Sequence, residues 1–184
     1  VLGRLVEELR GAPLQECLKT YIYLPAALAD AQASSIASGA DGVALSLNDM
    51  ASFARLWLRS GVSVRGARVL TQRTCRRMVE EQLFIPPVPM RQYVGLGWRV
   101  QRNPRGVYSF FHIGGAGGVA AWIQFFPQYD CAVFYLGNPA EYTDEVTDHV
   151  FRMQVKLAAL AGAFAGAPGN IADFEPTPPD ESVL

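Results

Sequence analysis

Cysteine and histidine are scarce in this chain of 184 residues. The three cysteines, Cys17, Cys75 and Cys131, are scattered without a C-x-x-C pair, which excludes the usual zinc-ligand spacings and a dense disulfide framework. Cys17 and Cys75 fall on apolar helix faces, where free buried thiols are expected. No metal and no cofactor is therefore expected.

Runs of one charge and long apolar runs are also missing. A net charge of −1 without a basic run argues against a nucleic-acid partner. The longest apolar run, residues 157–167, is too short and too rich in alanine and glycine for a transmembrane segment. Half of the residues are hydrophobic, so the chain can bury a core as one domain or part of one. Residues 166–184, with four prolines and four acids, are expected to be a disordered tail.

Apolar residues at helical spacing predict several helices. Ser46 and Thr71 are suited to cap two of them, because a hydroxyl can accept a free backbone N–H in the first turn. The second helix is expected to end before Pro25, and residues 26–45 and 84–92 are expected to be a loop and an extended connection. The predicted helices cover about residues 2–10, 14–22, 46–59, 71–79 and 143–163.

Alternating apolar residues predict strands in the second half of the chain. Tight turns separate them, at residues 103–106 and 127–130 and at a glycine-rich bend over 114–118. Four consecutive strands joined this way form an antiparallel meander, which needs helices to cover it and gives an α+β fold. The predicted strands cover residues 94–100, 107–113, 119–126 and 131–136.

His112 is the leading candidate for chemistry, because an imidazole ends a strand beside a turn almost free of Cβ atoms. A phosphate loop needs a helix after the glycines, and here a strand follows, so phosphate binding is not expected. A bare strand edge that offers an N–H to a developing oxyanion fits better. The alternative is a histidine that only packs among Tyr108 and Phe110.

Other candidate catalytic arrangements have weaker support in the sequence. No G-x-S-x-G elbow is present, and no spacing selects a Ser/His/Asp triad. A thiol nucleophile formed by Cys131 with His112 is a minor alternative. The remaining candidates have structural interpretations: His149 as a solvated helix residue, Asp49 as a helix cap, and Trp57, Trp98 and Trp122 as core.

Taken together, several segments resemble the serine β-lactamase and penicillin-binding-protein family. The closest likeness is to its class C branch, which includes many esterases and D-amino-acid peptidases. The resemblance covers residues 1 to about 160, and it implies that residues 1–165 are the C-terminal part of a β-lactamase/transpeptidase-like domain. The segments that carry it are residues 1–8, 39–49, 69–71, 95–98 (GLGW), 112–115 (HIGG) and 136–138 (LGN).

The resemblance implies roles for five consecutive residues. His112, Ile113 and Gly114 occupy the place of the family's Lys/His-Thr/Ser-Gly motif, so His112 is expected to orient or polarise the substrate. The backbone N–H of Gly115 is expected to be one of two oxyanion-hole donors. Ile113, Gly114 and Ala116 are expected to contact a small-molecule or peptide substrate. Ile113 departs from the family's hydroxyl residue and removes a hydrogen bond to a substrate carboxylate.

Two motifs of the family are not in the sequence. No serine is followed three residues later by lysine, Ser52 with Arg55 being nearest, and no tyrosine has asparagine two residues on. The chain is therefore interpreted as the C-terminal half of a domain whose N-terminal half carries the nucleophile. Without that serine it is expected to be inactive alone. The resemblance suggests an exported protein, periplasmic or secreted.

Three rival interpretations remain open. The intact protein is an acyltransferase of the same family, or the chain is a non-catalytic binding protein, a pseudoenzyme or a truncated product. The third is a structural or dimerisation module that exposes an unpaired sheet edge.

Overall fold

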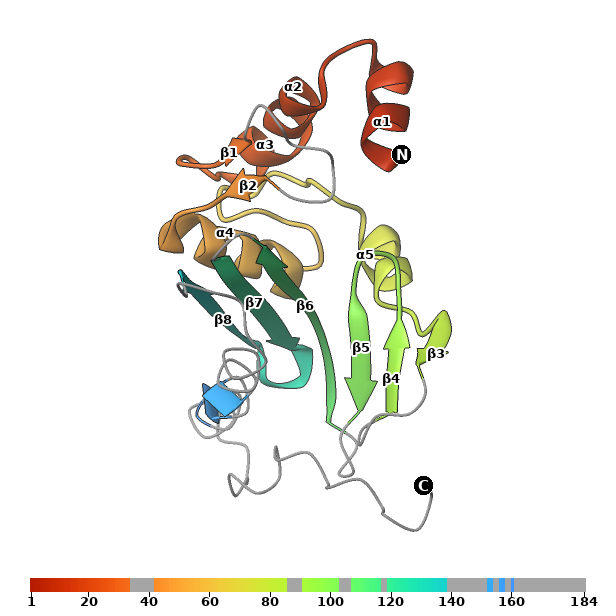
Figure 1. Ribbon diagram of the computed structural model, residues 1–184, viewed down its shortest axis with the longest axis vertical. Coiled ribbons are helices and arrows are strands. Elements are labelled where there is room, and N and C mark those ends of the chain that lie inside the picture. Colours follow the sequence, from red (N-terminus) through yellow and green to blue (C-terminus); the bar gives the residue numbers. More distant parts are fainter. Residues whose placement is uncertain are drawn as a thin grey trace. The chain divides into compact units, whose positions relative to one another are not determined.

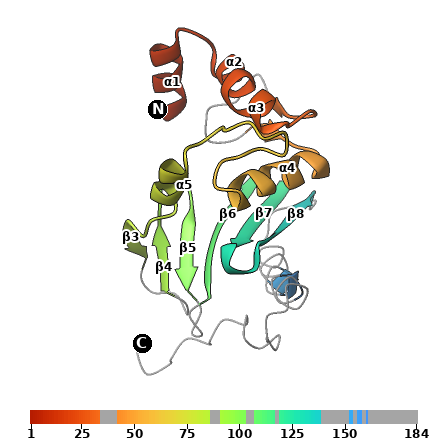
Figure 2. The same ribbon diagram turned by 180° about the vertical axis from the view of Figure 1, so that it is seen from behind.

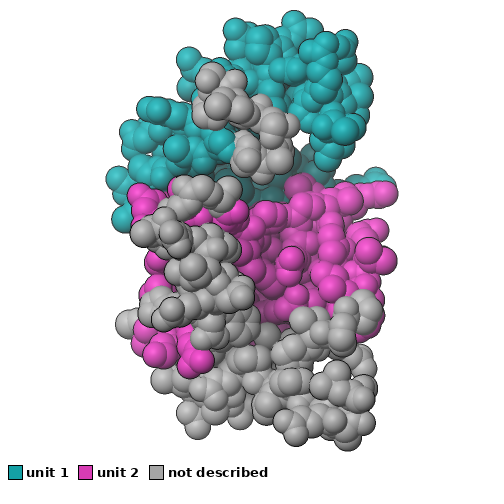
Figure 3. All heavy atoms as spheres, in the orientation of Figure 1, with its two compact units in different colours: residues 1–75 teal, residues 76–184 magenta. Residues whose placement is uncertain are grey.

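The computed structural model describes residues 1–33, 42–85, 91–102, 107–116 and 119–138, and also Arg152, Met153, Lys156, Leu157 and Leu160. The chain divides into two compact units, Val1–Cys75 and Arg76–Leu184, coloured teal and magenta in Figure 3. Helices dominate the first unit, and one antiparallel sheet dominates the second. The predicted α+β fold class is confirmed.

The first unit combines helices with a short two-stranded ribbon (Figure 1). The ribbon lies inside the stretch predicted as a loop, so that prediction is wrong for these few residues. The elements are α1 (Leu2–Arg10), α2 (Leu14–Leu18), the π-helical turn η1 (Lys19–Tyr23), α3 (Leu24–Ala26), β1 (Gln32–Ala33), β2 (Val43–Ala44) and α4 (Leu47–Leu58), followed by α5 (Gln72–Met78) at the boundary of the units.

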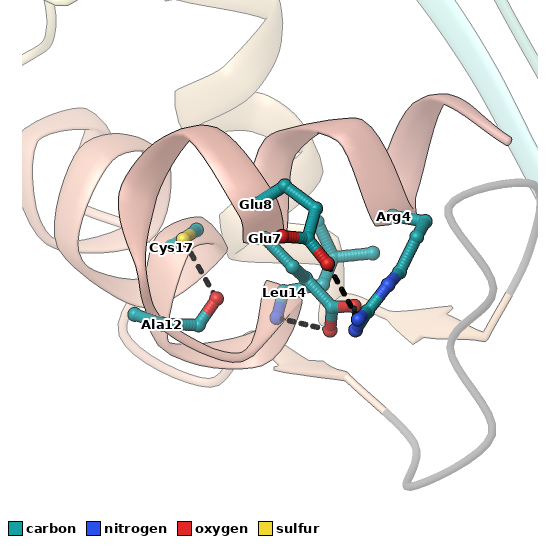
Figure 4. A network of polar contacts seen from close by, with 6 residues as sticks. All are labelled: Arg4, Glu7, Glu8, Ala12, Leu14 and Cys17. Atoms are coloured by element: carbon teal, nitrogen blue, oxygen red, sulfur yellow. Dashed lines mark hydrogen bonds and ion pairs between the residues drawn. The ribbon is translucent and has the colours of Figure 1, made fainter.

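A polar network joins α1 to α2 (Figure 4). Gly11 ends α1 in the left-handed region, at φ 63°, where a residue without Cβ is not strained. The Glu7 carboxylate accepts the backbone N–H of Leu14 at 2.9 Å and so caps the start of α2. That hydrogen bond, aided by the nearby Arg4 guanidinium, lowers the pKa of Glu7. The expected helix over residues 2–10 is confirmed, but Leu2, Leu5 and Leu9 are exposed.

The second helix does not end before Pro25, as the sequence predicts, but continues to Ala26. The reason is η1, in which the N–H of Leu24 bonds to the carbonyl of Lys19, five residues back. A proline ring normally strikes the carbonyl four residues before it. The wider π-helical turn relieves that conflict and lets the helix run through the proline.

Both predicted hydroxyl caps are confirmed. The Ser46 hydroxyl accepts the N–H of Asp49 at 3.2 Å at the start of α4, and the Thr71 hydroxyl accepts the N–H of Thr74 at 3.0 Å at the start of α5. Asp49 does more than favour the helix dipole. Its buried carboxylate accepts the N–H of Asp30 at 3.1 Å and ties the loop before β1 to α4.

The core of the first unit lies where α4 meets the end of the second helix. Tyr23, Ala26, Leu28 and Leu56 are buried together there. Met50, Ala54 and Trp57 on α4 are also buried. Cys17 and Cys75 are buried free thiols, as predicted.

The second unit is built on a six-stranded antiparallel sheet, in which each strand pairs with the next one along the chain (Figures 1 and 2). The predicted meander is therefore right in kind, but two strands longer than expected. Its strands are β3 (Leu83–Ile85), β4 (Arg91–Val94), β5 (Arg99–Arg102), β6 (Tyr108–Ala116), β7 (Val119–Phe126) and β8 (Cys131–Gly137).

The expected single strand over residues 94–100 is wrong, because the chain turns back within it. Gly97 adopts φ 83°, and the N–H of Gly95 bonds to the carbonyl of Trp98 at 2.7 Å. Residues before and after this turn belong to β4 and β5, which pair with each other. Leu96, which completed the apparent alternation, lies exposed in the turn.

Two further boundaries differ from the prediction. The expected connection over residues 84–92 contains most of β3 and the start of β4, while its three prolines lie outside the described residues. The expected bend over 114–118 begins later, because β6 continues to Ala116. Gly114 and Gly115 are paired strand residues, opposite Ala121 and Ala120.

One face of the sheet carries an aromatic cluster, here called the aromatic face. Phe110 stacks on Phe125 with ring centroids 4.7 Å apart, and Trp98 meets both rings edge-on. All three side chains are buried. Since paired residues in an antiparallel sheet share a face, the register also places Val100 and His112 there.

The opposite face carries a row of buried polar side chains and is called the glutamine face. Gln92, Gln101, Ser109 and Gln124 lie on four consecutive strands. The Gln124 amide donates to the Ser109 hydroxyl at 2.8 Å, and the Gln92 amide donates to Gln101 at 3.5 Å. Such buried groups need these partners, because an unmet hydrogen bond in the core is costly.

The last predicted helix and the tail are described only in part. Within residues 143–163, the five residues that the structure describes are helical, and the rest lie outside the described residues, as do residues 166–184. That this helix covers the sheet stays a prediction. Within the described parts of the chain, no helix combines the length and apolarity needed to cross a membrane.

Candidate functional site

The candidate site lies on the part of β6 that extends past its neighbour β5. The last residue of β6 that pairs with β5 is Phe111, opposite Arg99. From residue 112 to residue 116 the strand pairs only with β7. On the other side, the described residues provide no partner strand. We call residues 112–116 the open edge.

His112 begins the open edge, and its side chain is exposed. It pairs with Ile123 on the aromatic face, and its ring stands nearly perpendicular to that of Trp98, with centroids 6.4 Å apart. The imidazole therefore packs against the end of the aromatic cluster while it remains accessible. The contact with Trp98 fits the structural interpretation of His112, and its exposure leaves the imidazole accessible; its role in chemistry stays a prediction.

The other predicted site residues follow on the same strand and alternate between its faces. Gly114 shares the aromatic face with His112, and a Cβ there would lie 3.9 Å from the Ala121 side chain, at ordinary contact distance. Ile113 lies on the glutamine face, opposite Trp122, with 37% of its surface exposed. Gly115 is exposed and pairs with Ala120, and the backbone of Ala116 pairs with Val119.

The open edge has the chemistry of an unpaired strand. In an antiparallel pair, alternate residues direct their N–H and C=O groups to opposite sides, so every second residue of the open edge faces away from β7. Such groups can bind an extended peptide as an added strand, or hydrogen-bond a single carbonyl oxygen. Gly115 has no side chain, so a ligand can approach its backbone closely.

The alternative thiol site is not assembled. Cys131 lies in β8 opposite Phe126, and β7 separates β8 from β6, so Cys131 and His112 are not on neighbouring strands as the sequence suggested. Burial, and then the carboxylate of Asp130, raise the pKa of the Cys131 thiol. A protonated thiol two strands away is not a nucleophile for His112 to activate.

The three tryptophans Trp57, Trp98 and Trp122 are buried, as the sequence predicts. Asp49 has a structural role other than the expected cap: Ser46 caps α4, and the buried Asp49 carboxylate accepts the N–H of Asp30. His149 lies outside the described residues. Within the described parts of the chain, no three histidine, cysteine or acidic side chains cluster closely enough to hold a metal ion.

Sequence reasoning missed two features of the site. Trp98 was assigned to the core, but its ring also supports His112. The open edge was missed because it depends on where β5 begins, and that follows from the turn at residues 95–98. Gly95 and Gly97 are compatible with a tight turn, but the apolar alternation around them is equally compatible with a strand, so the pairing of β4 with β5 was needed to decide.

Comparison with known proteins gives the family context. The family model described as Beta-lactamase matches residues 1–157. Among curated proteins, none matches the chain significantly.

Two solved structures share the fold. One is the octameric penicillin-binding protein homologue from Pyrococcus abyssi, at 15% identity and TM-score 0.70, over 90% of this chain and 40% of that one. The other is a penicillin-binding protein from Bacillus halodurans, at 13% identity and TM-score 0.64, over 83% of this chain and 53% of that one. This chain therefore spans about half or less of the length of either protein.

Proposed function

This chain belongs to the beta-lactamase family, and from that premise we propose that the open edge is one wall of the cleft of a serine hydrolase. The reaction is transfer of an acyl group from an ester, amide or β-lactam to a serine, followed by hydrolysis. The observation that carries the proposal is the open edge itself, which pairs with β7 on one side only.

The roles follow from the geometry of the strand. The outward N–H of Gly115 donates to the carbonyl oxygen as it becomes an oxyanion, and the strand holds the substrate in extended form. His112, exposed and supported by Trp98, orients the substrate or a proton-relay group on the aromatic face. Ile113 offers no hydroxyl to a substrate carboxylate, which favours substrates that lack one at that position.

The nucleophile is proposed to come from a polypeptide segment outside these 184 residues. The sequence holds neither Ser-x-x-Lys nor Tyr-x-Asn. Loss of a catalytic serine typically lowers the rate by several orders of magnitude. The chain alone is therefore expected not to hydrolyse a chromogenic ester or cephalosporin, and not to be labelled by a fluorophosphonate.

The direct test is the intact mass and labelling of the native polypeptide in its source. A polypeptide of roughly twice this mass that is labelled by a fluorophosphonate supports the hydrolase. In that protein, His112→Ala is expected to lower kcat/KM by a factor of about a hundred or more. A native mass equal to that of these 184 residues, or labelling of the isolated chain, contradicts the proposal.

The assignment of Gly115 has its own test, which needs only this chain. Proline lacks the N–H and is tolerated on the free side of an edge strand. Gly115→Pro is expected to fold with little loss of stability, whereas Gly114→Pro removes a hydrogen bond to β7 and destabilises the sheet. The opposite ranking in a denaturant titration would show that Gly115 faces β7 and cannot be the oxyanion donor.

A second candidate function is peptide binding without catalysis. The same open edge favours it, because strand addition needs backbone groups and no nucleophile. Binding of an extended peptide to this chain, measured by calorimetry and lost in Gly115→Pro, together with a native mass equal to this chain, would favour the binding protein over the hydrolase.

A further inference from the structure

A second surface of the molecule is defined by its charge. Between Met50 and Val79 the sequence contains seven arginines and no acidic residue, although the whole chain has a net charge of −1. No two of the first five arginines are adjacent in sequence, so they form no basic run. Five of the seven belong to the first unit, and all five are exposed: Arg55, Arg59, Arg65, Arg68 and Arg73, here called the arginine surface.

Local structure connects the segments that carry these arginines. Arg55 and Arg59 lie four residues apart at the end of α4 and therefore on one side of the helix. The Arg68 guanidinium donates to the carbonyls of Ser60 and Leu70, at 3.3 and 3.2 Å. Arg68 thus connects the end of α4 to the residues that lead into α5.

The turn between the two helices adds a fourth cation and an apolar side chain. The N–H of Gly66 bonds to the carbonyl of Ser63 at 3.0 Å, which makes Val64 and Arg65 the two central residues of a β-turn. Val64 is 36% exposed. Arg73 then follows at the start of α5, and the same helix continues with two more exposed arginines, Arg76 and Arg77.

Nothing in the described parts of the chain neutralises this charge. The ion pairs there involve Arg4 and Arg102, and none includes a member of the arginine surface. Arg68 is also close enough to Cys75 to oppose the effect of burial, which raises the pKa of that thiol. Exposed cations carried by one stretch of chain that contains no acidic residue produce a positive potential that attracts anions.

We propose that the arginine surface docks the protein on an anionic phospholipid bilayer. The guanidinium groups bind lipid phosphates, and Val64 at the tip of the turn enters the interfacial region. A bilayer matches the observations because it requires no fixed register between its charges and the arginines. The bilayer interface also stabilises an apolar side chain that inserts beside a cation, whereas the phosphates of a nucleic-acid duplex give no such stabilisation. This function is separate from the open edge and does not depend on it.

The test is co-sedimentation of the purified chain with vesicles. We expect binding to phosphatidylcholine vesicles that contain phosphatidylglycerol, no binding to phosphatidylcholine alone, and weaker binding as salt rises. Each arginine near an anionic surface strengthens binding about fivefold, so Arg55→Gln/Arg59→Gln/Arg73→Gln should weaken binding by about a hundredfold. Arg68 is left in place, because it bonds the backbone.

A matched control removes three exposed cations from elsewhere, as Arg4→Gln/Arg99→Gln/Lys156→Gln. Both triple variants lose the same net charge, so an effect of overall charge alone would weaken them equally and overturn the proposal. Equal binding to neutral vesicles would also overturn it, as would preferential binding to duplex DNA or polyglutamate at the same salt. Thermal melting of both variants checks that they fold.

Discussion

The strand β6 has two halves that are built differently. Its first half, residues 108–111, pairs with β5 throughout, and Phe110 and Phe111 also pair with β7. Ser109, Phe110 and Phe111 are buried there. Its second half, the open edge, pairs with β7 alone, and the side chains of His112 and Ile113 are exposed there. The first half of β6 thus contributes buried side chains to the core, and the second half exposes an accessible edge. The change occurs between Phe111 and His112.

This division shows how an exposed binding edge is kept in place. An unpaired strand end would fray by itself, because it lacks half of its hydrogen bonds and most of its buried surface. Here the register of the open edge is set by the buried half that precedes it and by its own five paired residues on β7. The geometry proposed for catalysis or binding therefore depends on residues that never touch a ligand.

The largest expected difference between the halves is in core packing. Phe110→Ala removes a buried ring that stacks on Phe125 and contacts Trp98, and should cost about 3–5 kcal/mol of unfolding free energy. The exposed His112→Ala, two residues further on, should cost less than about 0.5 kcal/mol. Urea denaturation of both variants measures this, and equal losses would show that the open edge is part of the core.

Glycine substitutions should extend the comparison to a tightly packed position outside β6. A Cβ at Gly95, in the turn before β5, would overlap the carbonyl oxygen of Met78, so Gly95→Ala should cost about 1–3 kcal/mol of unfolding free energy. Gly114→Ala has only Ala121 nearby, at 3.9 Å, and should leave the melting temperature almost unchanged. A large loss for Gly114→Ala would mean that the open edge is packed more tightly than this spacing indicates.

Changing a hydroxyl group should affect stability in the first half of β6 but hardly at all in the open edge. Ser109→Ala deletes the acceptor of the Gln124 amide in the buried half and should cost about 1–2 kcal/mol. Ile113→Thr adds a hydroxyl at a position that is 37% exposed, and should change stability by less than about 0.5 kcal/mol. Guanidinium titrations test both. An unchanged unfolding free energy for Ser109→Ala would show that the glutamine face tolerates a Gln124 amide that has lost its hydrogen-bond acceptor.

The last prediction concerns pH in the first half of β6. The Tyr108 phenol donates to the carbonyl of Val79 at 3.0 Å, and burial raises its pKa from 10.0 to about 12. As pH rises from 10 to 12, the unfolded chain releases this proton before the folded chain does, so folding stability falls. The contribution is complete below pH 10.0 and is lost as pH passes about 12.

Tyr108→Phe isolates the contribution of the Tyr108 phenol to the pH dependence of stability. The variant should show a smaller decline in stability between pH 10 and 12 than the parent chain, measured as melting temperature against pH. Ultraviolet titration of the phenolate gives the pKa directly. If parent and variant decline equally, Tyr108 titrates as a solvated phenol.

Features that depend on neighbouring residues were predictable from the sequence. The capping hydroxyls of Ser46 and Thr71 each accept the N–H of the residue three positions later. Strands β6, β7 and β8 follow from the alternation of apolar residues. Of the five site residues, only His112 and Ile113 were expected on this strand; Gly114, Gly115 and Ala116 were expected in a bend and instead belong to β6. Their catalytic roles stay predictions.

Features that depend on distant contacts were not predictable. Val94, Leu96, Trp98 and Val100 alternate by coincidence, and only the pairing of β4 with β5 shows that a turn interrupts them. The helix through Pro25 required a π-helical turn, for which the sequence gives no local signal. The arginine-rich stretch is visible in the sequence, but its exposure without counter-charges required the structure.

The order of the sheet has a consequence for how the second unit forms. Because every strand pairs with its neighbour in sequence, each closure joins segments separated by a short turn, and the entropic cost of each loop is small. Proteins dominated by such local pairings fold faster than those that must first join distant segments. We therefore expect the sheet to assemble hairpin by hairpin as the chain leaves the ribosome, with the open edge forming when β7 pairs with β6.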